Sequence, residues 1–204
     1  MSDSDMGNDT TANNTLRKKE LGELALRNAE KMAFPPTEWE ANTLAEVLAL
    51  PRVTVTRPPE EQLLAAGMLP YDCHVNCFAQ AANDPDRMSR HVCGWLIYGS
   101  DLIFHSVVEV RGHWHCLTPQ LVQAPSQFQF IPDSFIEWLE TSDGARHAFR
   151  GGVRLPQGLR KYPEHHLRMR DEIHDLIASG MSAFDAREMV DVTLGAELRK
   201  MEPI

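Results

Sequence analysis

The sequence predicts an α+β domain in which a helix bearing Cys73 packs on a small antiparallel sheet, with helical extensions at both ends. Apolar residues recur with a helical period towards both ends of the chain, whereas the middle contains β-rich runs separated by short turns. These periodicities divide the 204 residues into five segments. We expect a disordered tail (1–14), helices with a short strand (15–69), the α+β core (70–140), a loop (141–161) and a C-terminal helical pair (162–204).

Composition narrows the class of protein. The net charge of −9 and the pI near 5.4 argue against non-specific nucleic-acid binding, which usually needs a basic surface. No apolar run approaches the ~20 residues that span a bilayer, and no signal peptide opens the sequence, so we expect a cytoplasmic protein that does not enter a membrane. Its four cysteines are then reduced thiols. The sequence leaves the oligomeric state open.

The N-terminal part alternates helices with proline-containing breaks. A helical pattern starts at Thr15 and ends before the prolines at 35–36, and a second helix follows Thr37 and stops before Pro51. Residues 52–56 alternate and are rich in β-branched side chains, which predicts a short strand or extended arm. Another helix is expected between Pro59 and Gly67.

The helix that bears Cys73 is predicted to begin after Asp72, a good N-cap residue, and to cover residues 73–82. It has two stripes. The apolar stripe, which we expect to face the core, consists of Val75, Phe78, Ala79 and Ala82. The neighbouring stripe consists of Cys73, Asn76, Cys77 and Gln80.

The β-rich runs at 92–98, 102–110 and 113–118 predict an antiparallel meander, with a fourth strand at 128–131. A helix is expected to start at Asp133 or Ser134, and two more to cover about 163–180 and 182–200. A two-residue turn at Arg111 and Gly112 places Cys116 and Thr118 beside His105.

The register of the first hairpin depends on its loop. A three-residue loop, Gly99 to Asp101, which we prefer, sets Trp95 opposite His105 and Cys93 opposite Val107. A two-residue loop would move Cys93 to the other face of the sheet.

Cys73 and His105 form the leading candidate site. A thiol in the first turn of a helix lies at the positive end of the helix dipole, which favours the thiolate. An imidazole on a facing strand can then act as the base, with a third group orienting it. This is the arrangement of a cysteine hydrolase, which needs no cofactor and forms a thioester with an amide, peptide or isopeptide-type substrate.

Several spaced motifs support this interpretation. They are CHVN at 73–76, GW at 94–95, HSVVE from His105, LTP at 117–119 and FIPD at 130–133. Together they resemble a group of bacterial and phage proteins of the papain-like superfamily, which includes the NlpC/P60-type cysteine hydrolases. The resemblance covers about residues 70–133 and implies a papain-like core, with Cys73 as nucleophile and His105 as base.

The chain departs from the pattern of this group at one position. Cys116 stands where the group has aspartate, and a neutral thiol orients an imidazolium poorly. Thr118, Asn76 or Asp133 are candidates to compensate. Asn76 and Cys77 are expected beside the site, and Trp95 is expected as one of its walls.

Two other functions remain open. A zinc protein could use the pair Cys73 and Cys77 with ligands from further along the chain. Those ligands would come from His91 and Cys93, or from His113, His115 and Cys116. In the preferred register Cys93 and Cys116 lie two strands apart, roughly 10 Å, which is too far for one ion. The chain could also be a non-catalytic protein-binding module on a papain-like scaffold, and the missing aspartate favours that reading.

Overall fold

A computed structural model describes residues 6–120, 124–142 and 144–204, with side chains from Thr15 onward outside those gaps. The chain divides into two compact units, one formed by residues 1–37 and 162–203 and the other by residues 38–161 with Ile204. These units cut across the predicted segments. The first helix joins the C-terminal helices, while residues 38–69 belong with the strands. Residues 1–5 of the predicted disordered tail lie outside the described residues, and a helix begins at Met6 within that tail.

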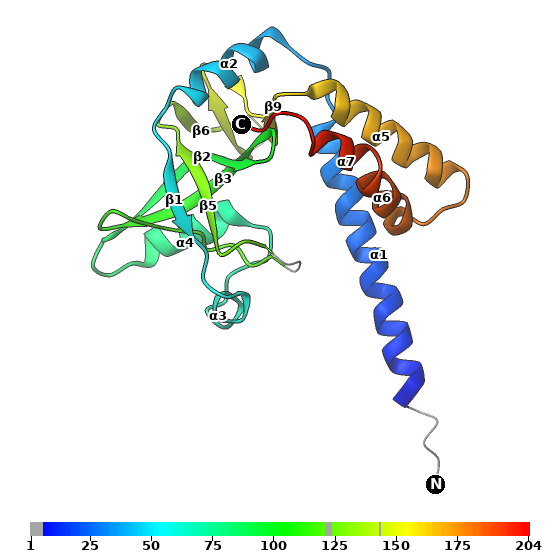
Figure 1. Cartoon of the computed structure of the whole chain (residues 1–204). Coiled ribbons are helices and arrows are strands. Elements are labelled where there is room, and N and C mark those ends of the chain that lie inside the picture. Colours follow the sequence, from blue (N-terminus) through cyan, green and yellow to red (C-terminus); the bar gives the residue numbers. More distant parts are fainter. Residues whose placement is uncertain (1–5, 121–123, 143) are drawn as a thin grey trace. The chain divides into compact units, whose positions relative to one another are not determined.

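In the described part of the second unit, five strands close into a β-barrel (Figure 1). They are β1 (Val53–Thr56), β2 (Ser89–Tyr98), β3 (Asp101–Val110), β4 (His113–His115) and β5 (Gln127–Pro132). Around the ring the order is β2, β5, β1, β4 and β3, and pairing of β3 with β2 closes it. A further strand, β9 (Gly158–Arg160), pairs with the N-terminal end of β3.

The predicted fold class, a papain-like core with a helix on a small antiparallel sheet, is therefore wrong. The reason lies in β1, which the sequence presents as a short arm before the Cys73 helix. In the structure β1 inserts between β5 and β4, antiparallel to the first and parallel to the second. This long-range pairing links the two edges that a simple meander would leave open.

The two hairpins of the barrel differ in how well the sequence predicted them. Val110 pairs with His113 across the turn at Arg111 and Gly112, as expected. The preferred register of the first hairpin is wrong. Tyr98 pairs with Asp101 across a two-residue turn whose first residue, Gly99, has a φ of 59°, as a type II′ turn requires.

A second sheet follows the barrel in the chain. It consists of β6 (Ile136–Glu140), β7 (Arg146–Arg150) and β8 (Val153–Arg154). The helix predicted from Asp133 or Ser134 is absent from the described residues, because β6 occupies its place and pairs with β7. Likewise, the segment 141–161 contains β7, β8 and β9 rather than a loop alone.

Helices α2 (Glu38–Leu48), α3 (Glu60–Ala65) and α4 (Cys73–Asn83) belong to the same unit (Figure 1). α4 packs against β3 and β2 with the side of the helix that the sequence did not favour. Cys73, Asn76 and Cys77 are buried, whereas Val75 is 50% and Phe78 55% exposed. The expected apolar core stripe of this helix therefore faces outward.

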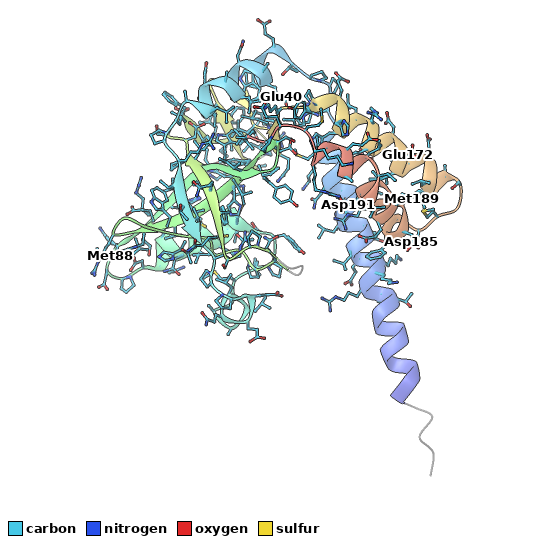
Figure 2. All side chains as sticks on the ribbon, in the orientation of Figure 1. Glu40, Met88, Glu172, Asp185, Met189 and Asp191 are labelled. Carbon is cyan, nitrogen blue, oxygen red and sulfur yellow. The ribbon has the colours of Figure 1, made fainter. Side chains whose placement is uncertain are left out.

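Two apolar clusters build the second unit. The barrel interior contains Val55, Val107, Cys116 and Phe130, contributed by β1, β3, the segment after β4, and β5. A cluster outside the barrel contains Trp95 and Leu102 with Val47 of α2. Beside it, Glu40 (labelled in Figure 2) forms a fully buried ion pair with Arg160, at 2.8 Å.

The first unit is helical. It consists of α1 (Met6–Met32), α5 (Pro163–Ala178), α6 (Ala183–Val192) and α7 (Leu194–Leu198). Ile173, Ala186 and Val190 form its core. The predicted last helix, expected to run from Ser182 to about Lys200, is interrupted at Thr193. Across the described residues we find no helix with the length and apolarity that a membrane span requires.

Candidate functional site

Strands β2 and β3 carry candidate residues on two opposite faces. His105 pairs with Gly94 and shares the barrel-interior face with Val107. Ser106 pairs with Cys93, and both side chains point away from the barrel interior. The two-residue turn at Gly99 causes this division, because a one-residue change of register would exchange the faces of β2.

His105 meets Cys116 inside the barrel. The Nε2 atom of His105 lies 3.4 Å from the Cys116 sulfur, and both residues are buried. The rings of Phe128 and Phe130 stand edge-on to the imidazole, with centroids at 5.9 and 6.5 Å. The structure thus brings together the predicted pair, although Cys116 itself follows β4 and donates its backbone N–H to Thr56 of β1.

Residues 116–119 connect His105 to the N-terminal end of α4. Asn76 donates its side-chain amide to the Leu117 carbonyl at 3.0 Å, and the Leu117 N–H hydrogen-bonds the Cys77 sulfur. Tyr71 donates its backbone N–H to the Pro119 carbonyl at 3.3 Å. A single short segment therefore contacts His105 at one end and the first turn of α4 at the other.

Asn76 holds this arrangement from within the helix. Its side-chain oxygen accepts the Leu69 N–H and its amide donates to the Leu69 carbonyl, both at 2.8 Å. Because the same amide also reaches Leu117, Asn76 ties the chain entering α4 to the segment after β4. Asn76 is buried in the first turn of α4, which also contains Cys73.

Cys73 is the first residue of α4 and is 8% exposed. Asp72 caps the helix by accepting the Val75 N–H. Burial, together with the neighbouring thiols of Cys73, Cys116 and Cys93, raises the pKa of the Cys77 thiol above its ordinary value. Cys73, Cys77 and Cys116 are all buried, and Cys77 stays protonated.

The described residues include no hydrogen bond between Cys73 and His105. Nε2 of His105 contacts Cys116, and the described residues form no hydrogen bond to its Nδ1 atom. The buried Thr118 hydroxyl, two residues from Cys116, also lacks a hydrogen-bond partner within the described chain. The Thr118 hydroxyl is therefore a buried polar group with unused hydrogen-bonding capacity.

Two predicted participants lie elsewhere. Trp95 does not form a wall of the His105 site, because it lies on the opposite face of β2 from Gly94. It is fully buried in the apolar cluster outside the barrel, with Leu102 and Val47. Its indole N–H donates to Asp133 at 2.9 Å. Asp133 also accepts from the Arg150 guanidinium, at 2.9 Å, so that carboxylate cannot take the place of the missing aspartate.

A second cluster of polar side chains, which the sequence did not predict as a group, lies on the outward face of β2 and β3. We call it the outer cluster site and define it as His74, His91, Cys93 and Ser106. The Ser106 hydroxyl lies 2.7 Å from His74 Nδ1 and 2.8 Å from His91 Nε2. The Cys93 sulfur lies 3.6 Å from His91 Nε2 and 3.5 Å from the Ser106 hydroxyl.

Aromatic side chains surround this cluster. Trp138 of β6 donates its indole N–H to the Cys93 sulfur at 3.2 Å, and its ring stands edge-on to His74. Burial alone would raise the pKa of the Cys93 thiol, but hydrogen bonds from His74, Trp138 and Ser106 outweigh it and lower that pKa. Burial and the nearby Arg146 lower the pKa of His91.

A pocket of about 580 Å³ opens on the outer cluster site. His91, Cys93 and Trp138 line it, together with Pro132 and Ile136. The sequence did offer one signal, the His91-x-Cys93 spacing on a strand, which places both side chains on one face. The sequence did not indicate that His74 joins these residues, because α4 was predicted to face the core with its other side.

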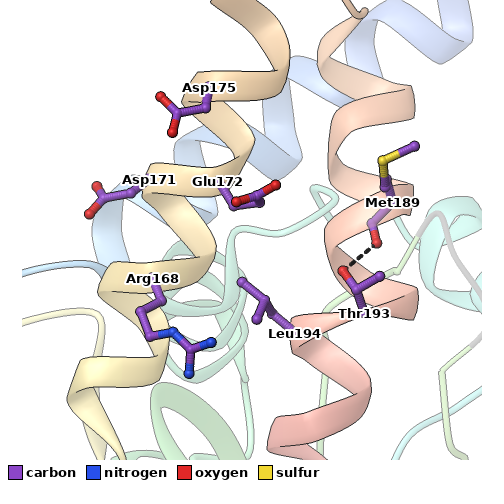
Figure 3. Close-up of a pocket in the computed structure, with 7 residues that line it drawn as sticks. All are labelled: Arg168, Asp171, Glu172, Asp175, Met189, Thr193 and Leu194. Carbon is purple, nitrogen blue, oxygen red and sulfur yellow. Dashed lines mark hydrogen bonds between the residues drawn. The ribbon is translucent and has the colours of Figure 1, made fainter.

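The helical unit has a hollow of its own, of about 450 Å³, between α5 and the α6–α7 segment (Figure 3). Arg168 and Glu172 line it, and Thr193 donates its hydroxyl to the Met189 carbonyl at its edge. Figure 3 shows the carboxylates of Asp171 and Asp175 directed away from α6. These are ordinary charges of an exposed helix and define no site.

Compared with models of protein families, with curated proteins and with solved structures, the chain gives no match. The function must therefore be argued from the geometry of the two clusters alone.

Proposed function

We propose that the protein is a cysteine-dependent hydrolase or acyl transferase in which Cys73 is the nucleophile and His105 the base. The observation that carries this proposal is the path of residues 116–119, which contact His105 through Cys116 and the first turn of α4 through Leu117. The barrel fold takes the place of the papain-like scaffold, and fold does not decide activity.

The proposed reaction uses the ring nitrogen of His105 that does not contact Cys116. His105 Nδ1 takes the thiol proton while the Cys73 sulfur forms a bond to the carbonyl carbon of an amide. When the carbon–nitrogen bond breaks, the imidazolium gives its proton to the departing amine and a thioester remains. A water, or an acceptor amine in a transferase, then gives its proton to His105 and attacks the thioester, which releases the sulfur.

Backbone N–H groups at the start of α4 supply hydrogen bonds for the oxyanion, since the first N–H groups of a helix have no partner within it. Cys116 accepts or donates one hydrogen bond at Nε2 and so fixes the ring, but it adds no negative charge. We therefore expect slower turnover than an aspartate in that position would give, because the imidazolium formed in the reaction is less stabilised.

An activated ester tests the proposal without knowledge of the substrate. With p-nitrophenyl acetate, the wild-type chain should release a burst of one p-nitrophenolate per active site and carry an acetyl group on Cys73, located by peptide mapping. Cys73→Ala should abolish the burst, and His105→Gln should slow it by about 100-fold or more. Cys93→Ser, which removes a cysteine outside the site, serves as the matched control and should retain the burst.

Tryptophan fluorescence should verify that each variant is folded, because Trp39, Trp95, Trp114 and Trp138 all belong to the unit that carries the site. An acetyl group found mainly on another cysteine, or a burst that survives Cys73→Ala, would refute the assignment. Binding without acylation in a folded wild-type chain would favour the alternative function, a non-catalytic protein-binding module.

A further inference from the structure

The outer cluster site has a composition suited to a metal ion. We propose that His74, His91 and Cys93 bind one Zn²⁺, on the face of β2 and β3 opposite to His105. Two imidazoles and one thiolate are a ligand set that zinc prefers, and three protein ligands leave one position of a tetrahedral ion for another oxygen. This site is independent of the proposed activity of Cys73.

The spacing of the ligand atoms fits the ion. With Zn–N bonds of about 2.0 Å and a Zn–S bond of about 2.3 Å, tetrahedral geometry separates nitrogen from sulfur by about 3.5 Å. The Cys93 sulfur and His91 Nε2 are 3.6 Å apart. All three ligand atoms lie within 4.8 Å of one another, so side-chain movements of about 1 Å complete the triangle.

Ser106 lies beside the three ligand atoms. Its hydroxyl oxygen is within 2.8 Å of both histidine nitrogens and 3.5 Å from the Cys93 sulfur. The two distances to nitrogen are hydrogen-bond lengths, shorter than the separation of about 3.3 Å between oxygen and nitrogen ligands of a tetrahedral zinc ion, so zinc binding would replace these hydrogen bonds. We expect the fourth coordination position of the ion to be filled by the Ser106 oxygen or by a water molecule that it holds.

The ligands come from regular secondary structure. His91 and Cys93 alternate along β2, Ser106 is the cross-strand partner of Cys93, and His74 comes from the first turn of α4. The Trp138 N–H bond to the Cys93 sulfur is the kind of outer hydrogen bond that orients a ligand. The adjoining pocket, which His91 and Cys93 line, gives the ion a route of entry.

These ligands differ from the zinc sets that the sequence suggested. Cys73 and Cys77 lie on the buried side of α4 near Cys116, and Cys116 lies inside the barrel. Cys93 points away from the barrel interior, whereas Cys116 lies inside it. Only the His91 and Cys93 pair of the suggested sets takes part.

Zinc content tests the proposal directly. The full-length chain is stripped with a chelator, incubated with zinc sulfate, separated from free ion and analysed by atomic spectroscopy. The wild type should bind one equivalent, Cys93→Ser and His91→Ala should lose it, and Cys73→Ser should keep it as the matched cysteine control. No retained zinc in the folded wild type, or loss in Cys73→Ser in place of Cys93→Ser, would overturn the proposal.

Cobalt substitution keeps the test valid if a variant is unstable. In the wild-type chain Co²⁺ should give the visible bands of a four-coordinate ion and a near-ultraviolet thiolate-to-cobalt charge-transfer band. Trp138→Phe, which leaves all ligands in place, should retain these bands while zinc affinity falls by about 10-fold. A cobalt spectrum without the charge-transfer band would exclude Cys93 as a ligand and contradict the proposal. Loss of zinc with an unchanged acylation burst, or the reverse, would separate this site from the proposed activity.

Discussion

Replacement of Gly94 by alanine should disturb the packing of β2 against β5 in the barrel, next to His105. A Cβ atom at position 94 would lie 2.2 Å from the Ile131 carbonyl oxygen and 2.7 Å from the ring of Phe130. Carbon and oxygen ordinarily meet at about 3.3 Å, so the backbone of β5 would have to move by about 1 Å relative to β2. Strain of this kind in a packed core costs about 3 kcal/mol.

Gly99→Ala is the matched control, because both glycines belong to the hairpin of β2 and β3 but are needed for different reasons. A Cβ atom at Gly99 meets nothing within 4 Å, and its cost comes from the positive φ of 59° alone. That conformational cost is about 1 kcal/mol. The difference between the unfolding free energies of the two variants therefore measures the cost of the steric clash at position 94.

The assay is urea unfolding of the full-length chain, followed by tryptophan fluorescence. Because all four tryptophans lie between residues 38 and 161, this signal reports the barrel unit and is insensitive to the helical unit. Gly94→Ala should also slow acylation of Cys73, since Gly94 is the cross-strand partner of His105. If Gly94→Ala were no more destabilising than Gly99→Ala, the close contact between β2 and β5 would be refuted.

Three further predictions concern the same unit. Glu40→Gln removes the carboxylate that the buried Arg160 guanidinium contacts at 2.8 Å and should destabilise the unit by about 3–5 kcal/mol in the same unfolding assay; an effect below about 1 kcal/mol would contradict the buried pair. Hydrogen bonds from Ser89 lower the pKa of Asp84, so its stabilising effect is present above the pKa of the unfolded chain and is lost as the pH falls through the lower folded value. Protection of the Ser89 amide from hydrogen exchange should therefore decline in acid, and Asp84→Asn should remove that decline; an unchanged pH dependence in this variant would contradict the assignment. Phe78→Ser should change the unfolding free energy by less than about 0.5 kcal/mol because Phe78 is 55% exposed, and a larger loss would mean that the orientation of α4 is wrong.

The sequence predicted local structure better than long-range pairing. The turn at Arg111 and Gly112, the strand at 52–56 and the helix start at Asp72 depend on neighbouring residues, and the structure contains all three. Barrel closure depends on the pairing of Val53 with Phe130, which are far apart in the chain. No local pattern specifies such a pairing, so the sheet was predicted to be open.

The orientation of α4 was predicted wrongly for a related reason. An apolar stripe normally faces the core, yet Val75 and Phe78 are exposed and the thiols of Cys73 and Cys77 are buried. Polar Asn76 is buried because three backbone groups satisfy its side-chain amide. Hydropathy alone cannot reveal such compensation, since the partners come from residues 69 and 117.

The candidate site was therefore predicted in part. The contact between His105 and Cys116 followed from strand alternation and one turn, whereas the outer cluster site needed both the correct register at Gly99 and the rotation of α4. The same one-residue change of register moved Trp95 out of the predicted site and brought Cys93 beside Ser106. Errors of register and helix phase thus explain most of what the sequence missed.

The rate of modification of Cys73 by iodoacetamide, at one neutral pH, tests the central claim most directly. Peptide mapping gives this rate separately for Cys73 in the wild type and in His105→Gln, with tryptophan fluorescence as the measure of folding. If His105 activates Cys73, the rate should fall by about 100-fold in the variant. Equal rates in two folded proteins would show that the imidazole does not act on this thiol, and would contradict the proposed mechanism.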